Sequence, residues 1–279
     1  MRARAAAAAP SAASYGELDD GSVAVSTTTG GESTGTTGAA QLGEIQEIHI
    51  VRKIFHMLWG AGFIIARHQM GARYIYKFDR ILALLLSFTF LVETARMQYP
   101  GFNKFLRTWL HPVMRQGEQS RFTGVFYYLL GVFIVSKIAE ANFLVFDAAV
   151  ANLAIGDPMA SMAGILSGNR GRLPNGKSLV GFAVGWLSSF GALIAVYALT
   201  KESRREMAIL GFHGEKHRMA LALFGGSVGA AAELAVPTPP PQINSARFPL
   251  GIDDNLIVPV ISCIVIQNTV DAIAAGHVF

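Results

Sequence analysis

The sequence predicts an all-α, polytopic membrane protein with about seven transmembrane helices and one interfacial helix. Of the 279 residues, 52% are hydrophobic and only 15% are charged, whereas soluble proteins average about 25% charged residues. The apolar residues gather in runs of helical length that are spread evenly along the chain. No alternation of strand and helix patterns interrupts these runs. The pattern therefore indicates one membrane domain rather than a soluble domain with an anchor.

Residues 1–47 differ in kind from the rest of the chain. They are rich in Ala, Ser, Thr and Gly and contain almost no large apolar side chains, so they cannot bury enough surface to fold. We therefore expect a disordered N-terminal tail. Its first residues carry arginines and no acids, which also permits a transit peptide. Residues 48–279 are predicted to form the membrane domain.

The apolar runs follow in order at residues 51–66, 81–95, 122–138, 143–155, 179–199, 219–236 and 256–275. A transmembrane helix needs about 20 mostly apolar residues, so the shorter runs require cover from their neighbours. Between the second and third runs, residues 102–116 place Phe102, Phe105 and Trp109 on one helical face. We expect this segment to be an interfacial helix lying on the membrane surface.

Ionisable residues mark the ends of the apolar runs. A charge at the bilayer centre costs at least ~2.5–3.5 kcal/mol, so such residues indicate a polar cavity or a partner. If the runs cross the membrane alternately, all of the clusters fall on one face, and we interpret them as a single site. The clusters are Arg52, Lys53 and His56; Glu93 and Arg96; Asp157; Lys177 and Ser178; Glu233; and Asp253, Asp254 and Asn255.

The clusters also have structural interpretations that the sequence leaves open. Arg52 and Lys53 could be ordinary cations flanking a helix. Glu93 and Arg96 could form an ion pair that closes a helix, and the acidic residues before the last run could be helix N-caps. The net charge of +4 is modest and spread over short loops, which fits lipid headgroups or phosphates rather than nucleic acid.

Residues 171–178, GRLPNGKS, match the P-loop pattern G-x-x-x-x-G-K-[ST]. A P-loop follows a buried strand, and the preceding residues MASMAGILSGNR do not read as one, so a P-loop NTPase is not expected. The tract can still bind an anion, because its glycines let the backbone approach the anion closely and the following helix N-terminus attracts it. Arg170, Arg172 and Lys177 are therefore a candidate phosphate cradle.

Carboxylates near this tract are candidate metal ligands. Asp157, helped by Asp254 or Glu233, can bind a divalent cation such as Mg²⁺. Cations on phosphate oxygens together with a carboxylate-held metal are the minimal apparatus of phosphoryl or nucleotidyl transfer. Because the site is predicted at headgroup level, its acceptor is expected to be a lipid.

Four motifs in order, RKIFH, TGVFYYLLG, GDPMAS followed by KSLVG, and DDNLIVP, resemble those of the CTP-dependent lipid kinases. This group includes the fungal-type diacylglycerol kinases, the dolichol kinases and the phytol kinases. The resemblance extends over residues 51–271, and VETARMQYPGFNKFLRTWLHPVMR is most similar to the diacylglycerol kinases, which typically have Asp where this chain has Glu93. The segment 233–253 is longer and richer in proline than is usual in the family.

The resemblance implies transfer of the γ-phosphate of CTP to diacylglycerol, giving phosphatidate, with Mg²⁺ or Ca²⁺ as cofactor. It implies an active site on the cytosolic face of the endoplasmic reticulum or nuclear membrane, with a plastid membrane as an alternative. Asp157, Lys177 and Asp254 are the expected catalytic residues, and Asp157, Asp254 and Glu233 the expected metal ligands. The expected nucleotide-binding residues are Arg52, Lys53, Arg170, Arg172, Lys177, Ser178 and Asn255.

Three alternatives remain open at this stage. The first is the same chemistry on an isoprenoid alcohol such as dolichol or phytol. The second is CTP:phosphatidate cytidylyl transfer, which would release pyrophosphate instead of CDP. The third is a non-catalytic transporter that uses its charges as a substrate path.

Overall fold

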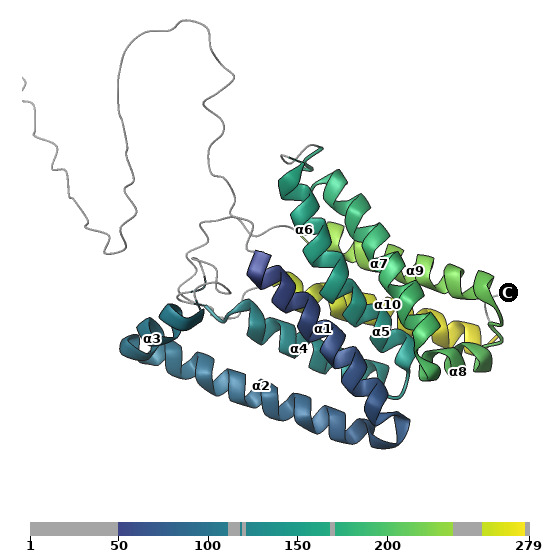
Figure 1. Cartoon of the computed structure of the whole chain (residues 1–279), viewed down its shortest axis with the longest axis horizontal. Coiled ribbons are helices and arrows are strands. Elements are labelled where there is room, and N and C mark those ends of the chain that lie inside the picture. Colours follow the sequence, from purple (N-terminus) through teal and green to yellow (C-terminus); the bar gives the residue numbers. More distant parts are fainter. Residues whose placement is uncertain (1–49, 111–117, 119–120, 168–170, 237–252, 277–279) are drawn as a thin grey trace, which may run out of the picture. The chain divides into compact units, whose positions relative to one another are not determined.

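The computed structural model of the chain describes residues 50–110, 118, 121–167, 171–236 and 253–276 (Figure 1). These residues form helices joined by short loops, and the β-structure among them is one isolated antiparallel bridge, between Arg172 and Ser178. The predicted tail at 1–47 lies outside the described residues. The elements are α1 (Ile50–Met70), η1 (Ala72–Tyr74), α2 (Ile75–Gln98), α3 (Pro100–Leu110), α4 (Gly124–Ala139), α5 (Phe143–Ala151), the π-helix η3 (Asn152–Gly156), α6 (Asp157–Leu166), α7 (Leu179–Leu199), α8 (Lys201–Ile209), α9 (Glu215–Ala235) and α10 (Asp254–Ala274).

Each predicted apolar run lies on a helix, and the run at 179–199 coincides with α7. Among the described residues, three helical segments are long and apolar enough to cross a membrane: Phe143–Leu166, Leu179–Leu199 and Asp254–Ala274. Helix α4 is also apolar but shorter. The predicted all-α, polytopic membrane fold is thus confirmed, while the number of spans stays a prediction.

Helix α3 matches the first part of the predicted interfacial helix, and residues 111–116 lie outside the described residues. The sides of α3 differ in polarity, since apolar Phe105 and Trp109 share one face. Both rings are exposed, Trp109 by 73%. An exposed apolar face on a helix next to membrane-spanning segments fits contact with the headgroup region.

The fourth apolar run is helical beyond its predicted end at residue 155. Helix α5 continues through η3 into α6, so Asp157 lies within a helical segment rather than at its end. The physical reason is Pro158, which has no N–H and whose ring would clash with the Ala154 carbonyl in a regular α-helix. The wider π turn avoids this clash, and in it the Asp157 N–H donates to the Asn152 carbonyl.

Helix α5 is the most deeply buried helix of the described chain, and all nine of its residues are buried. It contacts α1, α4, α7, α8, α9 and α10, and Figure 1 shows it among these helices. Its sequence, FLVFDAAVA, mixes aromatic and small side chains that can fill such a position. The π-helix η3 extends this buried core toward Asp157.

A buried polar cluster joins the helices at the C-terminal end of α1. The Arg67 side chain donates a hydrogen bond to Ser136 Oγ (3.0 Å), and its guanidinium lies 4.2 Å from the centre of the Phe146 ring. Asp147 is fully buried and accepts hydrogen bonds from Ser203 (2.7 Å) and the His68 ring (2.9 Å). His68 and Ser203 both contact Asp147 rather than each other, so the cluster holds α1, α5 and α8 together and is not a catalytic triad.

Close packing between η3 and α9 depends on a glycine. The Asn152 side chain donates to the Gly225 carbonyl (3.0 Å), and it lies where a Cβ on Gly229 would be. A larger residue at position 229 would therefore push α9 away from η3.

We expect Gly229→Ala to lower the unfolding temperature of the detergent-solubilised protein, because overpacking a core costs about 1–3 kcal/mol. Gly191→Ala is the matched control, since a Cβ there meets nothing within 4 Å. Thermal unfolding followed by circular dichroism measures both. Equal unfolding temperatures for the two variants would contradict the tight η3–α9 contact.

Candidate active site

Ionisable side chains from α1, α6, α9, α10 and the loop before α7 interact at one end of the helices. The charges of Lys53, Asp157 and Asp254 all act on His56. Asp157 and Asp254 also act on Lys177 and Glu233. The structure thus brings together residues that are up to about 200 positions apart in the sequence, as the alternating arrangement of the apolar runs predicts.

Lys177 and Glu233 form an ion pair in which Lys177 Nζ donates to Glu233 Oε1. Both side chains are largely buried, at 15% and 14% exposure. Asn175 supports the pair, because it accepts from the Lys177 N–H (3.1 Å) and donates to the Leu234 carbonyl (2.6 Å). The loop before α7 is thereby tied to the end of α9. Glu233 Oε2 is buried and has no hydrogen-bond partner among the described residues.

The electrostatics of this pair keep Lys177 protonated. Burial of the ammonium group lowers the pKa of Lys177, but the neighbouring Glu233 carboxylate raises it. Asp254 and Asp157 raise it further, so the pKa lies above its ordinary value. Lys177 is therefore a positive charge in contact with Glu233 and under the electrostatic influence of Asp254 and Asp157.

Arg52 forms the second buried ion pair, with Glu118 (Nη1 to Oε1, 3.0 Å). Glu118 also accepts from the Gly124 N–H (3.3 Å), which fixes the start of α4 next to Arg52. A Cβ on Gly124 would overlap the Arg52 guanidinium, so only glycine allows this approach. Sequence reasoning did not identify Glu118, because it lies in a polar segment without a motif.

The pair Glu93–Arg96 holds the chain that leads into α4. Arg96 donates to Glu93 (2.6 Å) and to the carbonyls of Glu118 (3.1 Å) and Arg121 (2.5 Å). Glu93 accepts from the Thr123 hydroxyl (2.8 Å) and N–H (3.2 Å). The ion-pair interpretation of Glu93 and Arg96 is confirmed, and the pair supports Arg52 through Glu118.

The remaining predicted residues have different surroundings. Ser178 is the N-cap of α7 and accepts from the Gly181 N–H (3.4 Å). Asn255 is buried at the start of α10 and donates to the Gly124 carbonyl (3.4 Å). Arg172 is exposed, and Arg170 lies outside the described residues. Ser178 and Asn255 therefore shape the site through backbone contacts.

Asp253 and Asp254 lie at the N-terminus of the last helix, where both carboxylates accept hydrogen bonds from the backbone. Asp253 is the N-cap of α10, and its carboxylate accepts from the Asn255 N–H (3.0 Å). Asp254 follows within the first turn and accepts from the same N–H (3.0 Å). The N-cap interpretation is confirmed for Asp253. Asp254 is also among the groups whose electrostatic influence reaches Lys177 and Glu233.

The protein side chains of this site can hold a divalent cation only together with oxygen atoms from a bound substrate or water. Among the described residues no three Asp, Glu, His or Cys side chains converge to form a metal centre. Mg²⁺ is commonly held by one or two carboxylates together with substrate phosphates and water. The mutual influence of Asp157, Asp254 and Glu233, and the unpartnered Glu233 Oε2, fit that incomplete donor set.

Comparison with known proteins identifies similar enzymes. The chain is 27% identical over 177 residues to CTP-dependent diacylglycerol kinase 1 of Schizosaccharomyces pombe, which covers 62% of this chain and 72% of the relative. It is also 27% identical over 242 residues to CTP-dependent diacylglycerol kinase 1 of Eremothecium gossypii, covering 81% of this chain and 68% of the relative. The chain resembles the fungal CTP-dependent diacylglycerol kinases. The resemblance predicted from the order of the motifs is thereby confirmed.

The similarity to these CTP-dependent diacylglycerol kinases extends over most of this chain and of each relative. No protein-family model matches the chain, and no solved structure matches it. Both relatives are kinases by name. The geometry described above is therefore the basis on which roles of individual residues can be argued.

Lys177 provides a test of the ion pair. Because its pKa is raised on folding, its protonated form stabilises the fold below the ordinary value of 10.5, and this contribution is lost as the pH rises through the folded value. We expect Lys177→Met to lower the unfolding temperature at about pH 8 by at least ~2–4 °C, which corresponds to ~1 kcal/mol. The difference from the unsubstituted protein should shrink at about pH 11.

Thermal unfolding in detergent at both pH values measures this difference. Lys201→Met is the control, because Lys201 is exposed at the start of α8. A difference that stays constant between the two pH values would show that the Lys177–Glu233 pair does not stabilise the fold.

Proposed function

We propose that the chain transfers the γ-phosphate of CTP to the hydroxyl of diacylglycerol, which gives phosphatidate and CDP. One observation carries the proposal: Lys177 is paired with Glu233, and the charges of Asp157 and Asp254 act both on Lys177 and on His56, on which Arg52 also acts. Phosphoryl transfer requires such a combination of cations and metal-binding carboxylates. The names of the two fungal relatives supply the nucleotide and the acceptor.

Arg52 and Lys177 would bind the phosphates of CTP. In the structure each cation contacts a carboxylate, Glu118 and Glu233 respectively. A buried cation needs an anionic partner, and a triphosphate can take the place of these carboxylates. Arginine can bind phosphate oxygens with two parallel hydrogen bonds, whereas lysine acts as a point charge. Lys53, next to Arg52, would add a third positive charge at the same helix end.

Asp157, Asp254 and Glu233 would hold a divalent cation, Mg²⁺ or Ca²⁺, against the phosphate oxygens. When bound, such an ion neutralises charge on the transferring group. If Lys177 turns toward a phosphate, the buried Glu233 carboxylate loses its partner, and a bound cation would then compensate its charge. Asp157 and Asp254 come from different helices, α6 and α10, so their separation depends on helix packing.

The proposed transition-state role of the cations follows from electrostatics. The transferring phosphoryl group carries its charge on oxygens, and fixed positive groups stabilise it more strongly in a partly buried site than in water. Because this transition state is loose, positioning matters more than the basicity of a carboxylate. We therefore assign Asp157 and Asp254 to metal binding rather than to proton transfer from the acceptor.

A site at the membrane boundary would be accessible both to a water-soluble nucleotide and to a lipid. CTP is water-soluble, while diacylglycerol stays in the bilayer, so they can meet only at a membrane boundary. The interfacial helix α3 follows α2 near the start of α4, at the end where Arg52 lies. We propose that this boundary is the cytosolic face of the endoplasmic reticulum or nuclear membrane.

The central experiment is an assay of the purified chain in mixed micelles with labelled CTP or ATP. Diacylglycerol, dolichol and phytol are tested as acceptors with Mg²⁺ or Ca²⁺ present. We expect phosphatidate from CTP and diacylglycerol, with release of CDP. Absence of a product with every acceptor would contradict the kinase proposal. Consumption of phosphatidate with release of pyrophosphate would instead identify a cytidylyltransferase.

A second prediction concerns Gly124, whose missing side chain leaves room for the Arg52 guanidinium. We expect Gly124→Ala to displace Arg52 and to lower kcat/KM for CTP by about 10²-fold, as loss of one charge-stabilising group typically does. Gly62→Ala, where a Cβ meets nothing within 4 Å, should retain full activity. Steady-state kinetics with varied CTP measure both variants. Unchanged kinetics in Gly124→Ala would remove Arg52 from the nucleotide site.

A further inference from the structure

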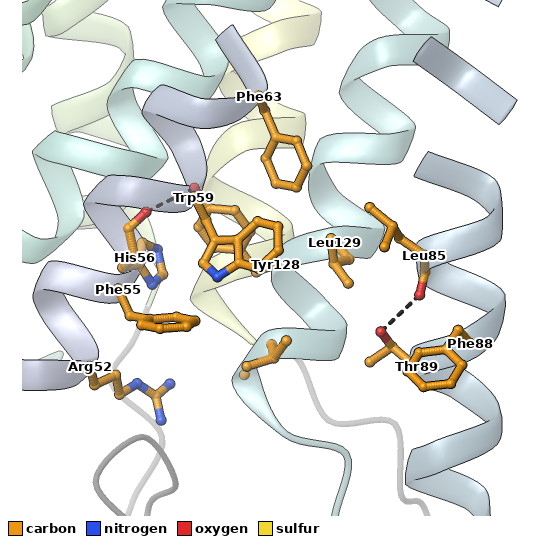
Figure 2. A pocket seen from close by; sticks show the side chains of 12 residues that line it. Arg52, Phe55, His56, Trp59, Phe63, Leu85, Phe88, Thr89, Tyr128 and Leu129 are labelled. Atoms are coloured by element: carbon orange, nitrogen blue, oxygen red, sulfur yellow. Dashed lines mark hydrogen bonds between the residues drawn. The ribbon is translucent and has the colours of Figure 1, made fainter. Parts of the chain in front are cut away.

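A pocket of about 240 Å³ lies between α1, α2 and α4, and Arg52 forms one end of it (Figure 2). Apart from that end, its wall consists almost entirely of aromatic and aliphatic side chains. They come from Phe55, Trp59, Phe63, Leu85, Phe88 and Leu129. The wall therefore suits a hydrocarbon group, while the end at Arg52 suits a polar or anionic group.

The depth of the pocket corresponds to one leaflet of a bilayer. Its lining residues on α1 run from Arg52 to Phe63, which lie at opposite ends of the view in Figure 2. These residues are separated by about three helical turns, or about 16 Å of rise. The hydrocarbon core of a bilayer is about 30 Å thick, so this distance equals about half of that thickness.

The pocket is accessible from the side of the helices. Phe55, Trp59 and Phe88, which line it, are exposed by 46%, 45% and 67%. Helices α1 and α2 are joined by the short η1 turn and diverge from it toward the end that carries Arg52 (Figure 1). If α1 and α2 cross the membrane as their apolar runs predict, a lipid can enter between them from the side.

His56 lies between the apolar wall and the ionisable residues. It lines the pocket, and its buried Nε2 atom has no hydrogen-bond partner among the described residues. The charges of Asp157 and Asp254 act on the same ring. Tyr128 holds His56 in place, with the rings in edge contact at 4.3 Å and the Tyr128 hydroxyl donating to the His56 carbonyl (3.2 Å). A buried, unpartnered nitrogen indicates a missing polar ligand.

We infer that this pocket binds one acyl chain of the acceptor diacylglycerol, with the glycerol hydroxyl hydrogen-bonded to His56 beside Arg52. The inference rests on the proposed kinase function and adds a binding site for its lipid. An acyl chain is about as long as one leaflet is deep. A polyprenol that spans more than a leaflet would extend out of this pocket, so its depth favours diacylglycerol as the acceptor.

The first test fills the deep end of the pocket with Leu85→Trp. The matched control is Leu84→Trp, because Leu84 is the preceding residue, is 71% exposed and does not line the pocket. Kinetics are measured in mixed micelles with dioctanoylglycerol and dioleoylglycerol. We expect Leu85→Trp to lower kcat/KM for the long-chain acceptor about tenfold relative to the short-chain one, since fewer methylenes are buried. Leu84→Trp should leave the ratio unchanged.

The second test does not require activity. Replacing Trp109 and Trp186 by Phe leaves Trp59 as the only tryptophan, inside the pocket. We expect saturable quenching of its fluorescence by diacylglycerol with brominated acyl chains, and weaker quenching by brominated phosphatidylcholine at the same mole fraction. Equal quenching by the two lipids would overturn the inference, because the pocket would then hold any bilayer lipid.

The two tests separate the inference from the proposed function. Selective quenching by diacylglycerol in a protein that phosphorylates no acceptor would overturn the kinase proposal and support the lipid site. Phosphorylation of both diacylglycerols by Leu85→Trp with an unchanged ratio of long-chain to short-chain kcat/KM would overturn the lipid site and support the kinase.

A variant pair tests the hydrogen bond between His56 and the acceptor. His56→Gln keeps a side chain that can hydrogen-bond, so it should retain more long-chain activity than His56→Ala. Equal losses of activity in the two variants would contradict this hydrogen bond.

Discussion

The ion pair between Arg52 and Glu118 joins α1 to the segment that leads into α4. Both side chains are buried, and loss of one partner would leave an uncompensated charge at a cost of about 3–5 kcal/mol. Glu118 in turn fixes the first N–H of α4, and Arg96 holds the same segment through its carbonyls. The proposed nucleotide site and the apolar pocket both have Arg52 as a boundary, so both depend on the position in which the pair holds Arg52 before a ligand binds.

A backbone feature determines where the central carboxylate lies. Pro158 would interrupt a regular helix, and the π turn before it keeps the helical segment that carries Asp157 continuous. Asn152, the first residue of that turn, is held by its bond to α9. The position of Asp157 relative to Glu233 therefore depends on the η3–α9 contact. The glycines that allow close packing of η3 against α9 therefore also affect where the charges of Asp157 and Glu233 lie.

The proposed nucleotide and lipid sites meet at Arg52 and His56. Lys177 and the carboxylates that act on it form a polar region suited to a triphosphate with a divalent cation. Trp59 and its apolar neighbours line the pocket and are partly exposed at the surface of α1 and α2. His56 belongs to both regions. Such an arrangement can align a lipid hydroxyl with a phosphate without exposing the acyl chain to water.

The sequence by itself determined the membrane fold, the helical runs and the residues at their ends. These follow from local properties, because a long apolar run must be helical in a bilayer and a charge such as Asp157 or Lys177 is tolerated only with partners. The order of the motifs also indicated the kinase resemblance. The glycine-rich sequence around Lys177 predicted that this residue binds phosphate. It did not predict which of several carboxylates would pair with Lys177.

The tertiary structure alone decided which groups meet. Glu118 contacts Arg52 across 66 residues, and Ser178 caps α7, a role that the motif did not reveal. The pocket could not be predicted either, because its lining comes from three helices whose divergence is not encoded in any one run. Pairing and cavities depend on how helices pack against one another, and that packing is set by side chains far apart in the sequence.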